Sequence, residues 1–195
     1  MADKVPDGTP SKSRYLVFIG PISNNATRFL RNACCTAVND KVTDLTIQFS
    51  SSGGTVDEGF SLYEFLLSLP LRLTMHNIGM VNSVAIIAFL AGDKRFANDN
   101  TIFYMHDETW TTLSAREYTS SKLKEYTYLL ESSKVRAKSI LKLRTKIDQS
   151  VLESPDFFKE PISYQPGAAK SAGIIHEIQD ALVPFGEMVL NIDWV

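Results

Sequence analysis

The chain has 195 residues, 44% of them apolar, and its 20 basic and 22 acidic side chains give a net charge of −2. This length and apolar content predict one domain with a full core and exclude general disorder. The near balance of charge gives no electrostatic reason to expect binding to nucleic acid or to an anionic membrane. Cys34 and Cys35 are adjacent and offer no metal-ligand spacing, so we expect a cytoplasmic protein without a metal or other cofactor.

The first half of the chain alternates short apolar runs with amphipathic stretches. Residues 1–13 are rich in Pro, Gly, Ser and Lys and predict a flexible arm, followed by a single domain over residues 14–195. Apolar runs predict three buried strands, at residues 15–19, 45–49 and 71–75. Helical spacing predicts one helix over about residues 25–39 and another between Gly54 and Pro70. This alternation predicts an α/β fold with a largely parallel sheet.

The second half contains the longest predicted element. Two short strands are expected at residues 95–97 and 101–105, around the turn Asn98-Asp99-Asn100. A charged stretch without Pro or Gly then predicts a helix over about residues 114–147, with Ser114 and Glu117 as its capping box. Such a long helix in a small domain is expected to project or to pack on a partner. A short helix over about residues 166–172, ending at Gly173, and an extended segment from Ile174 complete the chain.

Ser83 lies at the start of an unbroken apolar run within residues 79–92. The run is too short to span a membrane and suits a helix buried on all sides. The simplest role for Ser83 is therefore to cap this helix through its hydroxyl. The alternative is a nucleophile, because the backbone N–H groups that follow it, that of Val84 among them, suit a developing oxyanion.

Three features follow successive predicted strands and support the second role. Gly53 and Gly54 come after one strand, Ser83 follows the next strand, and His106 ends the later strand pair. Sites in α/β sheets form at the carboxyl ends of strands, where these residues would gather. Paired glycines let backbone N–H groups approach a ligand, and histidine is the usual base for a serine near neutral pH.

The order and local sequence of these pieces resemble the Clp protease proteolytic subunit, a serine peptidase family of the crotonase-like fold. The matching stretches are residues 49–54 (FSSSGG), 79–84 (GMVNSV), 92–98 (GDKRFAN), 103–106 (FYMH) and 169–175 (AKSAGII). The resemblance covers about residues 14–178 and implies a spiral of β-β-α units with a long protruding helix. Singly these motifs are weak, and it is their order that makes them specific.

The resemblance also implies a role for each matching residue. Ser83 matches the nucleophile and His106 the general base, so the implied reaction is peptide-bond hydrolysis through an acyl-enzyme. Gly53 and Val84 match the two backbone donors of the oxyanion hole, with Gly54 beside the first. The family implies peptide or unfolded-protein substrates, homo-oligomeric rings (a heptamer or stacked rings) interleaved through the long helices, and an AAA+ unfoldase partner.

Four departures from the family pattern leave alternatives open. The family's third catalytic residue is an aspartate, and counting back from Gly173 places Pro161 there, with Glu160 and Asp156 as the nearest carboxylates that could orient His106. Ser52 replaces a proline, residues 107–112 lack the family's glycines, and the short N-terminal arm lacks the apolar loop that engages the unfoldase ring. The alternatives are thus an impaired or inactive ring subunit or scaffold, or an acyl-CoA hydratase or isomerase on the same fold.

Overall fold

The computed structural model describes residues 4–6, 8–106, 119–154 and 156–192. Its strands run over Ser13–Ile19 (β1), Asp44–Ser51 (β2), Arg72–Asn82 (β3), Lys94–Ala97 (β4), Ile102–Met105 (β5), Ile162–Tyr164 (β6), Glu177–Ile178 (β7) and Val189–Asn191 (β8). Its helices run over Asn24–Asn39 (α1), Val56–Ser68 (α2), Val84–Phe89 (α3), Ser120–Arg144 (α4), Gln149–Glu153 (α5) and Pro166–Ser171 (α6). The mixed α/β architecture confirms the predicted fold class.

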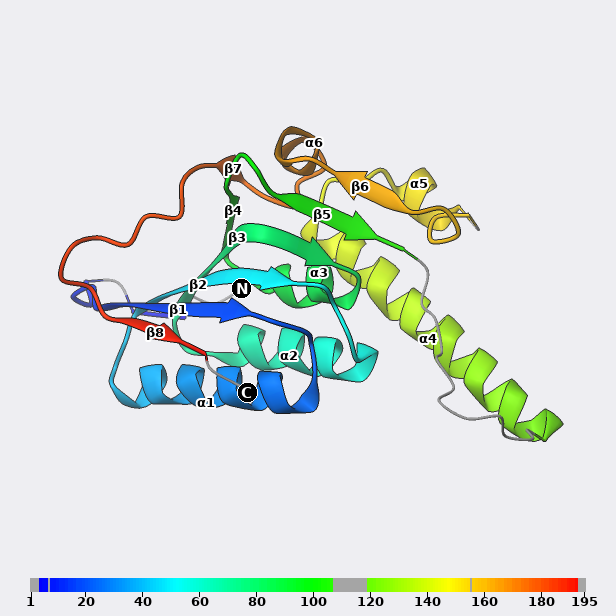
Figure 1. Cartoon of the computed structure of the whole chain (residues 1–195), viewed down its shortest axis with the longest axis horizontal. Coiled ribbons are helices and arrows are strands. Elements are labelled where there is room, and N and C mark those ends of the chain that lie inside the picture. Colours follow the sequence, from blue (N-terminus) through cyan, green and yellow to red (C-terminus); the bar gives the residue numbers. More distant parts are fainter. Residues whose placement is uncertain (1–3, 7, 107–118, 155, 193–195) are drawn as a thin grey trace.

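The strands form one sheet in the order β6-β5-β3-β2-β1-β8, and outside this order β4 pairs with β3 and β7 pairs with β4. Among the described strands, every pairing is parallel except that of β5 with β6. The helices α1 and α2 lie together against one face of the sheet (Figure 1). Parallel strands connected by helices place all their carboxyl ends at one edge, and the candidate site lies at that edge.

The first two helices form where their sequences provide an apolar face. In α1 the Ser23 hydroxyl accepts a hydrogen bond from the Ala26 N–H, which caps the helix as its sequence predicts. Glu58 of α2 accepts a hydrogen bond from the Thr27 hydroxyl at 2.7 Å and pairs with Arg31, which ties the two helices together. The bond from Thr27 lowers the pKa of Glu58.

The strand β3 is long because, besides β2, it pairs with two further strands along successive parts of its length. Its first part pairs with β4 from Thr74 onward, and its last part, Met80 to Asn82, pairs with β5. The sequence predicts only residues 71–75 as a strand, so the second part of β3 was missed. The reason is that residues 79–82 run directly into the apolar helix, and apolar runs alone do not separate a buried strand from a buried helix.

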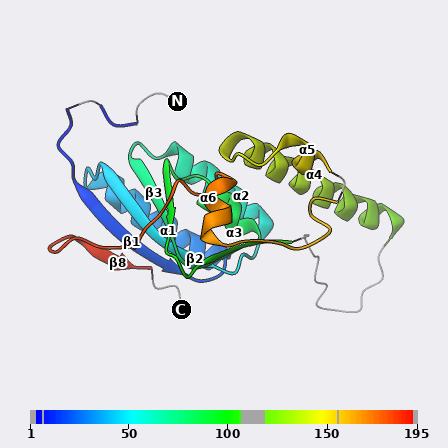
Figure 2. The same cartoon turned by 90° about the horizontal axis from the view of Figure 1, so that it is seen from above.

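The helix α4 projects from the body at the end where β5 finishes (Figure 1). It has 25 residues, begins after Thr119, whose hydroxyl accepts a hydrogen bond from the Lys122 N–H, and buries only Ala137 and Leu141. The capping box expected at Ser114 and Glu117 lies outside the described residues. The long projecting helix is confirmed, although it ends at Arg144 rather than about residue 147. Figure 2 shows α5 alongside α4 beyond the sheet.

The described residues nearest to each end of the chain contact the body. Val5 is buried and Lys4 pairs with Asp93 at 3.1 Å, so part of the expected N-terminal arm has tertiary contacts. At the other end β8 adds a strand beside β1, with the Tyr15 N–H donating to the Met188 carbonyl at 3.0 Å. The strands β6 and β8 and the helix α5 are not among the elements predicted from the sequence.

Candidate active site

Ser83 occupies the sharp turn from β3 into α3. Its backbone has φ 55° and ψ −134°, an uncommon conformation for a residue other than glycine that costs about 1–3 kcal/mol. The Ser83 N–H donates to the Tyr104 carbonyl at 2.8 Å, which fixes the turn to β5. The hydroxyl makes no capping hydrogen bond with α3. The simplest role, a helix cap, is therefore not one that this side chain performs.

Gly53 fits against Ser83 because it has no side chain. Its φ is 85°, and a Cβ atom there would lie 2.8 Å from both the Asn82 carbonyl oxygen and Ser83 Cβ. Gly54 has φ 151° and crosses the chain at Ile22, where a Cβ atom would lie 2.3 Å from the carbonyl oxygen. The Gly-Gly pair thus lets the chain after β2 pass directly beside Ser83.

The two glycines differ in the state of their N–H groups. The Gly53 N–H donates to the buried Ser51 hydroxyl at 3.2 Å. Within the part of the chain that the structure describes, no acceptor takes the Gly54 N–H. The family resemblance assigns the oxyanion donor to Gly53. Because the Gly53 N–H already donates to Ser51, Gly54 is the better candidate. The role of Ser51 was not expected from the sequence.

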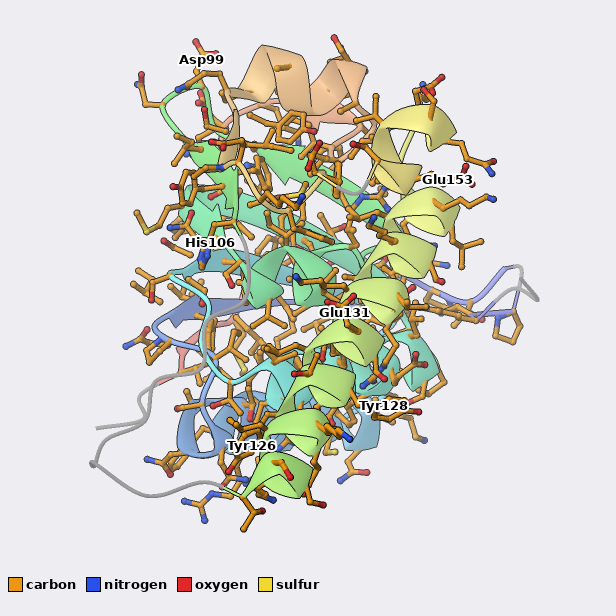
Figure 3. All side chains as sticks on the ribbon, turned by 90° about the vertical axis from the view of Figure 1, so that its right-hand side faces the viewer. Asp99, His106, Tyr126, Tyr128, Glu131 and Glu153 are labelled. Carbon is orange, nitrogen blue, oxygen red and sulfur yellow. The ribbon has the colours of Figure 1, made fainter. Side chains whose placement is uncertain are left out.

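His106 directly follows β5, the strand that pairs with the end of β3 just before Ser83. Asn82 pairs with Tyr104 in parallel register, so the residues that follow them emerge at the same edge of the sheet. The rings of Tyr104 and His106 lie 5.7 Å apart between centroids, which places both on one face. Figure 3 shows His106 at the end of the sheet where α4 also lies. The fold therefore brings Ser83, His106 and the Gly-Gly turn to a common edge.

The pairing of β6 with β5 shows which residue lies opposite His106. It pairs antiparallel with β5, with Met105 opposite Ile162, so one further step in this register places Pro161 opposite His106. Proline offers no side-chain acceptor to an imidazole N–H. Asp156 is exposed and pairs with Lys159 at 2.6 Å, and Glu160 is exposed as well. The position predicted for the third residue is thus occupied by a residue that cannot orient a histidine.

An apolar pocket opens beside Ser83 between α2, α3 and α4. Its lining includes Phe60, Val84, Ile86, Met105, Leu141 and Phe158, with Lys134 of α4 also bordering it. The Phe60 ring is covered by Arg136, whose guanidinium carbon lies 3.9 Å from the ring centroid. Sequence periodicity marks several of these residues as core, but it gives no sign that they share a cavity.

Neither metal ligation nor membrane spanning has support in the described ranges. No group of three or more His, Cys, Asp or Glu side chains among them is placed to hold a metal ion. None of the helices in the described part of the chain is both long and apolar enough to cross a membrane.

Comparison with known proteins agrees with this geometry. The sequence profile of the Clp protease family matches residues 10–181. The ATP-dependent Clp protease proteolytic subunit 2 of Borreliella burgdorferi is 23% identical over 184 residues, covering 91% of this chain and 88% of the relative. Subunit 2 of Mycolicibacterium paratuberculosis is 26% identical over 98 residues, covering 48% of this chain and 49% of the relative. A solved mutant of ClpP1 from Listeria monocytogenes superposes with a TM-score of 0.75 at 18% identity, covering 86% of this chain and 91% of that structure.

The chain belongs to the Clp protease family. Its fold is the crotonase-like fold of that family, as the resemblance implied. It is a serine-peptidase-type protein, either active or catalytically impaired. These matches give no support to the acyl-CoA hydratase or isomerase alternative.

Proposed function

We propose that this chain is a peptidase that uses Ser83 as nucleophile and His106 as general base. The observation that carries the proposal is the strained turn at Ser83, whose hydroxyl is not used as a cap although the residue occupies the capping position. Strained backbone in a native protein persists where surrounding structure holds it, and it concentrates at active sites. Here the holding structure is Gly53 on one side and the Tyr104 carbonyl on the other.

The proposed reaction is acyl transfer to water. His106 takes the hydroxyl proton as Ser83 Oγ attacks the peptide carbonyl, and the Gly54 and Val84 N–H groups hold the oxyanion. His106 then gives that proton to the leaving amine as the C–N bond breaks. His106 then deprotonates a water molecule, which attacks the acyl-enzyme. As the bond between the acyl carbon and Ser83 Oγ breaks, His106 gives that proton to Ser83 Oγ and the acid is released. No metal or other cofactor takes part in these steps.

The apolar pocket indicates the class of substrate. Its position next to Ser83 suits the side chain that precedes the cleaved bond, and its lining favours an apolar one. We therefore propose peptides or unfolded protein segments with a large apolar residue at that position. An AAA+ unfoldase partner and a cytoplasmic location stay predictions from the sequence.

Pro161 supports a second candidate, an inactive ring subunit or scaffold. Loss of the orienting carboxylate from a triad costs on the order of 10⁴ in rate when the rest is intact. A site with Ser83 and His106 but no carboxylate would therefore be slow rather than inert. An inert chain would need a further defect, or a partner subunit that aligns the site.

A fluorophosphonate probe separates the two candidates. We expect the purified oligomer to gain one probe mass per chain in intact mass spectrometry, and Ser83→Ala and His106→Ala to gain none on the same time scale. The physical reason is that the probe reacts with an activated serine, and both changes remove the activation. A folded, oligomeric wild type that gains no mass would refute the active peptidase and favour the scaffold.

The helix α4 supports a homo-oligomer. The helix projects from the body (Figure 1), and several of its apolar side chains are exposed to solvent, namely Leu123, Tyr128, Leu129, Val135 and Leu143. We propose that a second copy of the chain covers them in a ring assembly. Exposed apolar surface on this scale is otherwise unfavourable at about 25 cal/mol per Å².

A charge placed on α4 tests this assembly. We expect Leu129→Glu to shift the protein toward smaller species in sedimentation velocity, because a carboxylate would be buried at the contact. Asn32→Glu adds the same charge at an exposed polar position of α1, outside α4, and is expected to leave the assembly unchanged. Equal sedimentation of wild type and Leu129→Glu would exclude this face of α4 from the contact.

A further inference from the structure

The side chain of Asn82, which directly precedes Ser83, contains a buried oxygen with no donor. Asn82 Oδ1 has no hydrogen-bond partner among the described residues. The amide nitrogen of the same side chain lies 3.5 Å from Met80 Sδ, a weak acceptor. Unpaired buried acceptors are rare in native proteins and call for an explanation. This one lies beside the candidate nucleophile.

The sheet register places this oxygen on the face where His106 stands. Val81 and Phe103 pair across β3 and β5 and are buried, so the next residues along, Asn82 and Tyr104, share the opposite face. His106 is two residues after Tyr104 and returns to that face, as the 5.7 Å ring separation shows. Strand spacing puts the Asn82 and His106 Cα atoms about 8 Å apart, a gap that an asparagine and a histidine side chain span together.

We propose that Asn82 positions His106, with Oδ1 accepting the N–H of the imidazole nitrogen that faces away from Ser83. This inference rests on the proposed peptidase function. A histidine that acts as base toward a serine must keep one ring nitrogen unprotonated, and an acceptor on the other nitrogen holds that tautomer. An amide oxygen serves this purpose without bringing a charge. The contact between the amide nitrogen and Met80 leaves Oδ1 as the end that can accept.

The neighbouring side chains fit this role less well. Pro161, opposite His106 in the register, has no acceptor in its side chain. Ser163 lies on the same face, opposite Tyr104, but it is exposed and its hydroxyl can form hydrogen bonds with water. Asp156 is paired with Lys159. Asn82 thus combines a shared face with a buried oxygen that no described residue pairs with.

The test measures the rate of fluorophosphonate labelling of Ser83 against pH in the full oligomer. We expect Asn82→Ala to slow labelling by about 10- to 100-fold, the scale of a lost positioning contact. We expect Asn82→Asp to retain fast labelling and to move the pH of half-maximal rate upward, because a carboxylate favours the protonated imidazole. The double variant Asn82→Ala/Pro161→Asp is expected to recover at least tenfold over Asn82→Ala, since it supplies an acceptor from β6.

Ser163→Ala is the matched control, because it removes a polar group from the same face, and it should label at the wild-type rate. A purely structural role for Asn82 would lower stability in thermal melts but would not move the pH midpoint in Asn82→Asp. An unchanged rate and midpoint in both Asn82 variants would overturn the inference, as would slow labelling in Ser163→Ala alone.

The inference can fail separately from the proposed function. A wild type that never labels refutes the peptidase, and the ¹⁵N chemical shifts of the His106 ring then decide the positioning role by themselves. One ring tautomer in the wild type and a mixture in Asn82→Ala would support it. The same mixture in both proteins would overturn it. If Asn82→Ala does not fold, the same ¹⁵N measurement is made on Asn82→Asp, because aspartate matches asparagine in shape.

Discussion

Replacing Gly53 with alanine is expected to slow labelling of Ser83 by at least about 100-fold and to lower the free energy of unfolding by about 2–4 kcal/mol. The added Cβ would lie 2.8 Å from Ser83 Cβ and from the Asn82 carbonyl oxygen, and both are held by the turn that forms the site. The backbone at φ 85° adds strain for any residue with a Cβ atom. The rate falls because the nucleophile and its base move apart. Stopped-flow labelling and urea unfolding measure the two effects.

Gly167→Ala provides the matched control. Gly167 lies in α6, its φ is not positive, and a Cβ atom there meets nothing within 4 Å. We expect this variant to keep the wild-type labelling rate and to gain up to about 1 kcal/mol of stability, since alanine restricts the unfolded chain and favours a helix. A Gly53→Ala protein that labels as fast as Gly167→Ala would show that the Gly-Gly turn has no part in holding the nucleophile.

The sequence predicts those parts of the fold that local pattern determines. The limits of α1 were predicted because Ser23 caps it and its apolar positions repeat at helical spacing. The end of α6 was predicted because Gly173, with φ 69°, follows it. In both cases the determining residues lie within a few positions of the boundary. The order of the motifs was enough to predict the family.

The parts that the sequence does not predict depend on residues far apart in the chain. The turn at Ser83 takes its shape from Gly53, 30 positions earlier, and from Tyr104, 21 positions later. The position of Pro161 opposite His106 follows only from the pairing of β6 with β5. The unpaired oxygen of Asn82 depends on three-dimensional burial, and no sequence period reports it. The candidate residues could thus be named from the sequence, whereas their conformations and partners could not.

The contacts of Arg95 also join residues that are far apart in the chain, and its replacement has the largest expected effect on stability. Its side chain is buried and donates to four backbone carbonyls, those of Gly92, Arg144, Gly173 and Ile174. These carbonyls follow or end α3, α4 and α6, so one guanidinium joins three helix ends. Helix C-termini carry partial negative charge, which stabilises a buried cation. Burial still lowers the pKa of Arg95, to about 10.

We expect Arg95→Met to lower the free energy of unfolding by about 3–5 kcal/mol, because removing one side of a buried charged network leaves the other side unpaired. Arg95→Lys keeps the charge, but one ammonium group cannot reach four carbonyls. We therefore expect this variant to have a lower free energy of unfolding as well. Arg28→Met, at an exposed arginine of α1, should change stability by no more than about 0.5 kcal/mol in the same urea titration. If Arg95→Met unfolded at the same urea concentration as Arg28→Met, the three helix ends would be held by apolar packing alone. In that case α4, which borders the pocket beside Ser83, would not depend on Arg95 for its position.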